Sequence, residues 1–554
     1  MKRKIQSLLL ALALACSGAS AQSTGTIDIV FNGTSATVSI PTSITGVTSY
    51  INGANVSLTS TTQTTEYTYR VSGTSTDGSL TINGSYKLTL VLAGITLTNA
   101  HGGAAIDIEC GKRISVVMEE GSVNTLSDAP LGSQKAAFYF KGHPEFEGGG
   151  TLNVTGKLKH AISAKEYLEL KGTTGIINIL GAVSDGIHCG KGAAGNANNY
   201  FEMSGGTVNI TNVCSDGIDS DDFGVVKIKG GALSINVKDG GSGIKADSTL
   251  TIKGGSINIA VAGSDADGIR SDYAINICGG NTDIFVGGDG SKGIKSKTQT
   301  TSTVNGGGTI HISGGTIHIE HSGDTFTETT GETSSCVGIT ADKTLTQTDG
   351  TVSILAMGTD CQAYRGKEGE SLTGGVMKVT RIPWKIATRD YEYDMTVYGI
   401  VKSGDSNLTD YSGVAVGAFL GDDCVGYGDF ETADYGILRV RSHSTDSEEV
   451  TFKYYDWSNA SEAGLAADRA ITFSPAMVYG SPSEPVALLL KPRVKLGDVN
   501  GDGDVNVTDV MMTVGYILGN VPNGFIRDAG DINGDNDINV TDVMMIVNII
   551  LGLI

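Results

Sequence analysis

Residues 243–260, GIKADSTLTIKGGSINIA, contain two short runs in which apolar and polar residues alternate. The runs at 249–253 and 256–260 place Leu or Ile at every second position, which is the pattern of a half-buried β-strand. The Gly254-Gly255 pair between them is a turn signal, and a Gly-Ile pair opens the segment at Gly243. The stretch therefore predicts short strands joined by glycine turns.

Both glycine marks recur along the chain. Gly-Gly pairs begin at Gly205, Gly230, Gly254, Gly279 and Gly314, with spacings of 25, 24, 25 and 35 residues. Gly-Ile pairs begin at Gly186, Gly217, Gly243, Gly268, Gly293 and Gly338. Three short strands in each repeat of about 25 residues are the pattern of a parallel β-helix, whose coils stabilise one another by stacking at about 4.8 Å. An antiparallel sandwich would show hairpin turns without this fixed phase, so an all-β stack of roughly eleven coils between residues 80 and 365 is predicted.

The repeat also assigns faces to the strands. If each Ile of a Gly-Ile pair points inward, the residue two positions later does too, and these residues are all small: Cys189, Ser220, Ala246, Ser271 and Ser296. The outward column beside them contains His188, Asp219, Lys245, Arg270 and Lys295. The predicted edge is acidic over its first coils and basic over its last.

Like charges on neighbouring strands repel one another, so the acidic coils need screening or a metal ion. The carboxylates concerned are Asp185, Asp216, Asp219, Asp221 and Asp222. Ca²⁺ takes six to eight oxygen ligands, and a calcium site is predicted here, with a solvated acidic edge as the alternative. At the basic end, the candidates for binding the carboxylate of an anionic sugar are Lys245, Arg270, Lys292 and Lys295; solvated strand ends are the alternative.

Composition and the N-terminus indicate export. The 554 residues contain 78 Gly and carry 39 basic against 60 acidic residues, a net charge of −21 that argues against a nucleic-acid partner. Residues 1–21 have the basic start, apolar stretch and Ala19-Ser-Ala21 cleavage site of a secretory signal peptide. Cys16 offers a lipoprotein alternative, which is less favoured because Ala13 stands where a lipobox usually has Leu. No later run is long enough to span a membrane, so a secreted or cell-surface protein is predicted.

The seven cysteines that remain after cleavage follow no metal-binding or disulfide spacing. Most are therefore interpreted as small buried hydrophobic residues.

The last 59 residues hold two acidic loops that repeat 33 residues apart. The first contains Asp498, Asn500, Asp502, Asp504, Asn506 and Asp509, and the second Asp531, Asn533, Asp535, Asp537, Asn539 and Asp542. Their spacing is that of the oxygen ligands in an EF-hand calcium loop. Apolar helices are predicted after the loops, at 510–518 and 543–551. Nine acidic residues and one basic residue, Arg527, make folding without Ca²⁺ unfavourable.

Two resemblances follow from these residues. The segments 77–79, 91–99, 103–106 and 120–128, with 184–187 and 215–218, resemble the bacterial carbohydrate-binding β-helix family. That resemblance covers about residues 26–365 and implies a right-handed parallel β-helix, bound calcium, and binding of cellulose or polygalacturonate, with a fold like that of calcium-dependent pectate lyases. The β-helix domain is assigned to residues 22–370. Residues 496–554 resemble a type I dockerin, which implies a cohesin-bearing partner contacted around Val507-Thr508 and Val540-Thr541. A calcium-stabilised cap folded against its own protein is the alternative.

Between these regions, residues 375–492 lose the period and gain aromatic residues, and their alternating runs predict a small β-sandwich. The leading functional hypothesis is a secreted, calcium-dependent, non-catalytic polysaccharide-binding protein. A pectate-type lyase with Lys245 or Arg270 as base is the runner-up, although neighbouring Asp residues would raise the pKa of Lys245. A structural surface protein that only holds calcium is the third.

Overall fold

The computed structural model describes residues 25–190, 199–300, 305–386, 391–430, 434–490 and 495–553. The chain divides into two compact units, Met1–Arg381 and Ile382–Ile554. The predicted signal peptide lies outside the described residues. Within the described ranges, no helix is long and apolar enough to cross a membrane.

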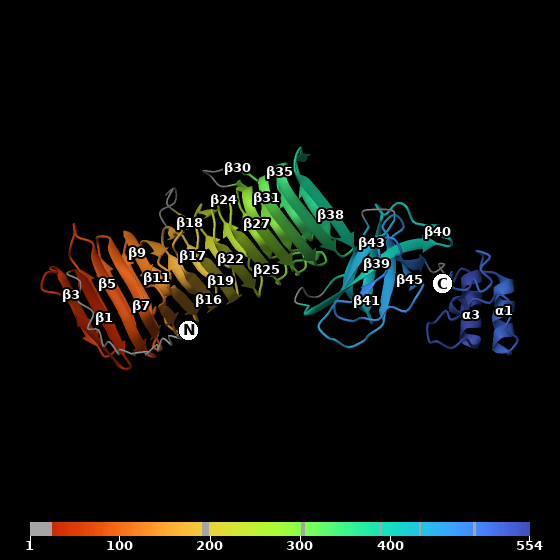
Figure 1. The fold of residues 1–554 in the computed structure, drawn as a ribbon, viewed down its shortest axis with the longest axis horizontal. Coiled ribbons are helices and arrows are strands. Elements are labelled where there is room, and N and C mark those ends of the chain that lie inside the picture. The colour runs from red at the N-terminus through yellow and green to blue at the C-terminus, as the bar shows by residue number, and fades with distance from the viewer. Residues whose placement is uncertain are drawn as a thin grey trace, which may run out of the picture. The chain divides into compact units, whose positions relative to one another are not determined.

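The first unit is built from two long sheets (Figure 1). The larger, 21-stranded sheet contains β1 (Thr26–Asn32), β2 (Ser35–Ser39), β5 (Tyr67–Ser75), β7 (Leu88–Thr98), β9 (Arg113–Met118), β10 (Val123–Ser127), β12 (His143–Glu147), β13 (Thr151–Gly156), β15 (Leu168–Leu170), β16 (Ile176–Ala182), β18 (Tyr200–Met203), β19 (Thr207–Val213), β21 (Val225–Ile228), β22 (Ala232–Val237), β24 (Thr249–Ile252), β25 (Ser256–Val261), β27 (Ala274–Val286), β31 (Thr309–Ser322), β35 (Thr344–Met357), β37 (Gly369–Leu372) and β38 (Val376–Ile382). The 13-stranded sheet contains β3 (Val47–Asn52), β4 (Asn55–Ser60), β6 (Ser79–Gly84), β8 (Ile106–Cys110), β11 (Ala136–Phe140), β14 (His160–Ala164), β17 (Ile187–Cys189), β20 (Ile218–Ser220), β23 (Ile244–Ala246), β26 (Asp267–Ser271), β28 (Lys292–Ser296), β34 (Val337–Ala341) and β36 (Gln362–Gly366). Two short hairpins project from the coils, β29 (Thr298–Thr300) with β30 (Asn305–Gly307) and β32 (Phe326–Thr327) with β33 (Thr333–Ser334).

Each coil contributes one strand to the 13-stranded sheet and two strands, or one long bent strand, to the larger sheet. In one such step β23 pairs with β26, while β24 and β25 both pair with the long β27, and all three pairings are parallel. The parallel register confirms the stacked repeats predicted from the glycine marks and excludes an antiparallel sandwich for this region. From β6 to β36 the 13-stranded sheet has eleven strands in the described residues, as the repeat length predicts. The first unit ends at Arg381, within β38.

The core of this solenoid runs along the inside of the coils. Every Ile of the predicted Gly-Ile pairs is fully buried, from Ile187 to Ile339, and the small residues two positions later are 0–1% exposed. The face assignment is therefore confirmed. Removing one such aliphatic side chain from water contributes about 1.5–3 kcal/mol, and many stacked coils together stabilise what one coil cannot.

Glycine is required in the Gly-Ile pairs and in the Gly-Gly pairs for two different physical reasons. The Gly of each Gly-Ile pair lies where opposite walls of the coil meet: a Cβ on Gly243 would be 2.4 Å from Ile259 Cγ2. The second Gly of each Gly-Gly pair bends the chain between two strands of one coil and has a positive φ, for example +92° at Gly255. That left-handed region disfavours residues with a Cβ.

The predicted β-sandwich at residues 375–492 is wrong in its topology. The structure has one nine-stranded sheet made of β39 (Tyr393–Ser403), β40 (Ser406–Asn407), β41 (Val414–Leu420), β42 (Asp423–Asp429), β43 (Gly436–Ser442), β44 (Val450–Asp456), β45 (Ser461–Ala467), β46 (Val478–Tyr479) and β47 (Val486–Leu490). The sheet closes on itself because β39 pairs antiparallel with β43 and parallel with β47. Alternation shows that each strand buries one face, but a closed sheet and two packed sheets satisfy that pattern equally.

The C-terminal segment contains α1 (Val507–Ile517), α2 (Arg527–Gly530) and α3 (Val540–Ile550). The long helices begin three residues earlier than predicted, because Asn506 and Asn539 cap their N-termini and form capping boxes with Asp509 and Asp542. The buried hydrophobic cluster of this segment consists of Val499, Ala529 and Ile546.

Candidate functional site

Three columns of polar side chains follow the 13-stranded sheet across successive coils. The register aligns His188, Asp219, Lys245, Arg270 and Lys295 as direct partners on β17, β20, β23, β26 and β28. A second column precedes it with Asp185, Asp216, Asp267 and Lys292, and a third follows it with Asp221, Asp247, Asp272 and Lys297. Neighbouring strands lie about 4.8 Å apart, so side chains of successive coils are in reach of one another. We refer to these thirteen residues as the charged face.

The acidic end of the charged face is neutralised by cations of the same face and by one buried histidine. Asp185 Oδ2 lies 3.0 Å from His160 Nδ1 and 3.3 Å from His188 Nδ1. His188 also lies 3.3 Å from Asp219 Oδ2, and Lys245 Nζ is 2.9 Å from Asp219 Oδ1. Acid and base therefore alternate over the three coils that carry His188, Asp219 and Lys245, which removes part of the like-charge repulsion expected from the sequence.

These contacts shift the pKa values of the groups. Burial opposes ionisation of Asp185, but hydrogen bonds from His160 and His188 outweigh it and lower the pKa of its carboxyl. Burial also opposes a charge on His188, yet its bonds to Asp185 and Asp219 raise the pKa of the imidazole to about 9. The pKa of Asp216 rises to about 7 because of burial and of repulsion from Asp219. The ionised form of Asp216 is therefore disfavoured by the negative charge of its neighbours.

Asp185, Asp216 and Asp219 are close enough to share a cation, since one oxygen of each lies within 4.8 Å of the others. A divalent cation there would relieve the repulsion that raises the pKa of Asp216. Asp221 belongs to a second donor group with His188 and Asp219. Asp222, also predicted as a ligand, joins no such group within the described residues; its backbone N–H donates to Asp247 Oδ2 at 3.0 Å.

At the basic end of the charged face, positive side chains lie close to one another as well as to carboxylates. Arg270 makes two hydrogen bonds to Asp272, and Lys295 Nζ lies 3.2 Å from Asp267 Oδ2. Burial, together with the positive charges of Arg270 and Lys295, lowers the pKa of Lys297. Positive charge is therefore crowded at this end, and Lys297 is a further candidate residue that was not predicted from the sequence. Its position in the same column as Asp272 is a sequence signal that could have identified it.

Lys292, a predicted sugar-binding residue, is buried in the wall. Its side chain is 6% exposed and its Nζ lies 3.1 Å from Asp265 Oδ1, with Ser334 Oγ and Gly290 O as further partners. Burial, with repulsion from Lys295, lowers its pKa. Lys245, Arg270 and Lys295 are more accessible, with side chains 14–25% exposed.

An aromatic ladder on the larger sheet is a separate feature. The rings of Tyr167 and Tyr200 are stacked with centroids 4.6 Å apart, and His143 stacks on Tyr167 at 4.5 Å. Lys227 Nζ lies 4.6 Å above the Tyr200 ring. The tyrosine faces are thus covered by each other, by His143 and by Lys227, so the ladder presents ring edges to a ligand.

In both C-terminal loops, the carboxylates at the first and last positions accept hydrogen bonds from backbone N–H groups of the loop itself. In the first, Asp498 accepts hydrogen bonds from the backbone N–H groups of Gly501, Asp502 and Gly503, and Asp509 accepts from Val499 and Asn506. In the second, Asp531 accepts from Asn536, and Asp542 from Ile532 and Asn539. Asn506 and Asn539, predicted as ligands, direct their Oδ1 atoms to the N–H groups of Thr508 and Thr541.

These residues fit a calcium ion. Asp531 Oδ1 is buried and has no hydrogen-bond partner, which leaves a carboxylate oxygen available for a cation. Gly503 has φ +93° and Asn536 has φ +65° at the sixth position, where the loop turns sharply. The donors of both loops are hard oxygens, which Ca²⁺ prefers.

Each loop also leads into an exposed apolar strip at equivalent helix positions. The first strip consists of Val507, Met511 and Leu518, and the second of Val540, Met544 and Leu551, with exposed fractions of 57–72%. Repetition at an interval of 33 residues gives the segment two similar apolar surfaces. Contiguous exposed apolar surface is typical of protein–protein contact sites.

Comparisons with known proteins match the solenoid and the C-terminal segment to two different families. The family described as carbohydrate-binding domain-containing protein matches residues 52–267 and 242–380, together more than half of the chain, and the protein belongs to that family. The type I dockerin domain matches residues 496–551. No curated protein matches the chain. A solved structure titled "Structure of the polysaccharide lyase-like protein from C. thermocellum, Gadolinium derivative" is 17% identical, covers 64% of this chain and 100% of its own, and has a TM-score of 0.27.

The family assignments establish the coarse function. The chain carries a carbohydrate-binding domain, and its dockerin implies a cohesin-bearing scaffold as partner. Type I dockerin domains bind calcium, which supports Ca²⁺ as the metal of this chain. Dockerin proteins are typically extracellular or cell-surface components.

Proposed function

We propose that the protein is a secreted, calcium-dependent binder of acidic polysaccharide, with polygalacturonate as the leading substrate and cellulose as the alternative. The coil is right-handed in this proposal, as parallel crossovers almost always are. The charged face binds the polymer and the dockerin attaches the protein to a cohesin. Val507-Thr508 and Val540-Thr541, extended by the exposed Met511 and Met544, contribute the cohesin contact.

The crowding of cations at the basic end supports an anionic ligand. Arg270, Lys295 and Lys297 occupy adjacent positions on two coils, and the lowered pKa of Lys297 reflects repulsion from the other two as well as burial. A uronate carboxylate placed among them would reduce that repulsion and accept charge-assisted hydrogen bonds. A neutral glucan offers no such compensation, which is why polygalacturonate ranks ahead of cellulose.

Calcium has two roles in this proposal. In the dockerin it stabilises the loops at Asp498–Asp509 and Asp531–Asp542. On the charged face, Asp185, Asp216 and Asp219 hold a second class of ion that bridges to sugar carboxylates, with Asp221 as a further donor. The acidic and basic ends then bind the same anionic polymer, one through calcium and the other directly.

Sedimentation of the purified chain with insoluble polygalacturonate or cellulose tests the proposal. We expect retention on polygalacturonate in calcium and at least a tenfold loss of affinity for a double Arg270→Gln, Lys297→Gln variant, corresponding to about 1.4 kcal/mol. Lys253→Gln, which changes an exposed lysine in a turn outside the charged face, is the matched control. Equal retention of all three proteins would refute binding through the basic end.

The calcium bridge requires its own variant. Asp216→Asn should weaken retention in calcium and make the residual binding less sensitive to a chelator, while cohesin binding through the dockerin stays intact. If retention fails on both polymers with a folded protein, the structural-protein hypothesis gains support.

The lyase hypothesis has one specific observation in its favour: burial and the positive charges of Arg270 and Lys295 lower the pKa of Lys297, which is the direction that a general base requires. The two bases predicted from the sequence fit less well. The charges of Asp219, Asp216 and Asp221 raise the pKa of Lys245 despite burial, and Asp272 raises the pKa of Arg270. Ultraviolet absorbance of an unsaturated uronate, followed in the same sedimentation tubes, distinguishes the two functions. We expect no increase in absorbance.

A further inference from the structure

The aliphatic interior of the solenoid is interrupted in its last coils. In the larger sheet, the inward column contains Val213, Val237, Val261 and Val286 as direct partners, and the next position is occupied by His321 on β31. The following coil returns to an apolar residue, Ala356. An imidazole thus replaces valine at one level of an otherwise apolar column.

A second column changes at the same level. The residues immediately before β26, β28, β34 and β36 stack on one another through backbone hydrogen bonds, and they are Ala266 or Ser291 in the earlier coils and Cys336 and Cys361 in the last two. The sequence spacing of these cysteines suggested only small buried hydrophobic residues. Stacking places both thiols beside the histidine.

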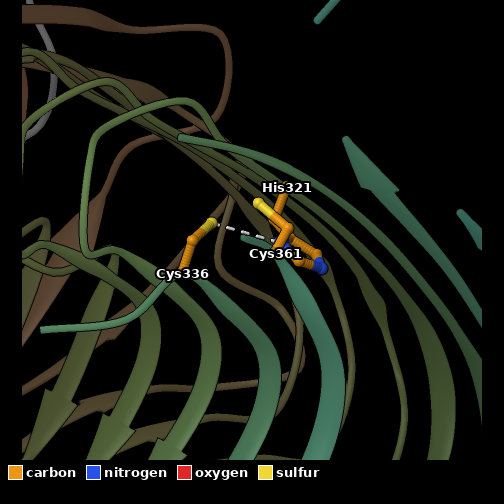
Figure 2. Close-up of side chains that lie close together, drawn as sticks. All are labelled: His321, Cys336 and Cys361. Atoms are coloured by element: carbon orange, nitrogen blue, oxygen red, sulfur yellow. Dashed lines mark hydrogen bonds between the residues drawn. The ribbon is translucent and has the colours of Figure 1, made fainter. Parts of the chain in front are cut away.

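The three side chains lie close together, as Figure 2 shows. His321 and Cys336 are 0% exposed and Cys361 is 1% exposed. His321 Nδ1 lies 3.2 Å from Cys336 Sγ, and one donor atom from each of the three residues lies within 4.8 Å of the others. The Cys361 thiol also donates to the carbonyl oxygen of Gly323 at 3.1 Å.

Apolar packing does not account for this group. His321 Nε2 is buried without a hydrogen-bond partner, and an unsatisfied buried polar atom destabilises a fold by about 1–3 kcal/mol. Two thiols and an imidazole that converge within the apolar core are instead a set of metal ligands, which bind as thiolates and neutral imidazole.

We propose that His321, Cys336 and Cys361 form a buried site for a thiophilic d¹⁰ metal ion, with Zn²⁺ as the expected occupant. Two thiolates and one imidazole are a donor set that zinc accepts, at about 2.3 Å to sulfur and about 2.0 Å to nitrogen. The fourth position is left to a water molecule or to the Gly323 carbonyl oxygen. The ion would connect two consecutive coils through the two cysteines and the opposite wall through the histidine, near the C-terminal end of the stack.

A disulfide between Cys336 and Cys361 is the competing arrangement in an exported protein. It would join the same two coils but would leave His321 Nε2, within a column of valines, without a hydrogen-bond partner. A metal site accounts for all three residues that differ from the earlier coils, His321, Cys336 and Cys361, and for this reason the observations favour it.

The test uses the full exported chain purified in reductant and saturated with calcium, so that the dockerin loops are occupied. Tightly bound zinc is measured by mass spectrometry of the metal, and Co²⁺ is then exchanged into the site to produce a thiolate-to-cobalt charge-transfer band, which carboxylate loops cannot give. The variants are His321→Val, Cys336→Ser and Cys361→Ser. Cys110→Ser, which removes another buried thiol that bonds to the Tyr86 carbonyl, is the matched control.

We expect one zinc per chain and a cobalt–thiolate band in the parent protein and in Cys110→Ser, and loss of both in the three site variants. His321→Val restores the residue that the preceding coils contain, so it should fold even if a cysteine variant does not. Absence of the band from a folded, reduced parent protein would overturn the proposal. So would a peptide map of the protein exported without reductant in which Cys336 and Cys361 are linked by a disulfide while the reduced chain takes up no zinc.

Discussion

The solenoid and the dockerin segment are both built from repeats, but different interactions stabilise them. In the solenoid each coil adds fully buried aliphatic residues, such as Ile244 and Ile269, to one continuous core. In the dockerin segment the buried hydrophobic cluster is limited to Val499, Ala529 and Ile546, while Asp509 and Asp542 are buried as well. We therefore expect apolar burial to stabilise the first region, and neutralisation of the carboxylates to be needed for the second.

Removing calcium should have the largest effect and should separate the two regions. With a chelator we expect loss of α1 and α3 while the strands of the solenoid persist, since ligand at a thousandfold excess over its Kd contributes about 4 kcal/mol per site. Circular dichroism with limited proteolysis measures this, with cleavage expected only within residues 496–553. Helices that survive chelation would show that apolar packing also suffices for the dockerin segment.

Adding a methyl group to the glycine of a Gly-Ile pair should have the next largest effect on stability. Gly243→Ala places a Cβ 2.4 Å from Ile259 Cγ2 and 2.6 Å from the Gly268 carbonyl oxygen. Overpacking of this kind destabilises by about 1–3 kcal/mol, and we expect a lower Tm of the solenoid with the dockerin unaffected. Gly111→Ala is the control, because nothing lies within 4 Å of its Cβ. Equal Tm values for the two variants would mean that the coil walls can separate without loss.

The pH dependence of the solenoid should reflect Asp107, whose pKa is raised to about 6 by burial and by Glu109, while Lys141 opposes the shift. Tyr139 is its partner on the next strand. Because the folded pKa exceeds the unfolded value, the contribution to stability is present below pH 3.8 and is lost as pH rises through about 6.

Asp107→Asn should therefore stabilise the solenoid at pH 7 by about 1–2 kcal/mol after allowance for solvent screening, and should flatten the pH profile between 4 and 7. Thermal unfolding across that range measures it, with Asp239→Asn at an exposed position as control. An unchanged profile would assign the pH dependence to other carboxyls.

The smallest expected effect is a difference in calcium affinity between the two dockerin loops. Asn536 occupies a left-handed conformation where the first loop has Gly503. Asn536→Gly should raise the calcium affinity of the second loop slightly, whereas Asn536→Ala should weaken folding by about 1 kcal/mol. Calorimetric calcium titration measures both, and an Ala variant equal to the parent would remove backbone strain as the distinction between the loops.

Sequence periodicity predicted the solenoid well because its determinants are local. The Gly-Ile and Gly-Gly marks specify where each coil narrows and bends, and the alternation around them specifies the inward face. The closed nine-stranded sheet of the second unit was predicted less well, because the pairing of β39 with β47 joins residues almost ninety positions apart. No local pattern distinguishes that closure from two packed sheets.

Spacing within a few turns of chain specifies the coil repeat, the alignment of the charged columns and the two acidic loops, so these features can be predicted from the sequence. Which side chains meet depends instead on how the coils stack: His160 with Asp185, Lys245 with Asp219, and His321 with Cys336 and Cys361. Coils differ in length, and insertions such as the one between β28 and β34 hide the register in the linear chain. Stacking restores that register in space, so the partners of a side chain are set by the coils above and below it.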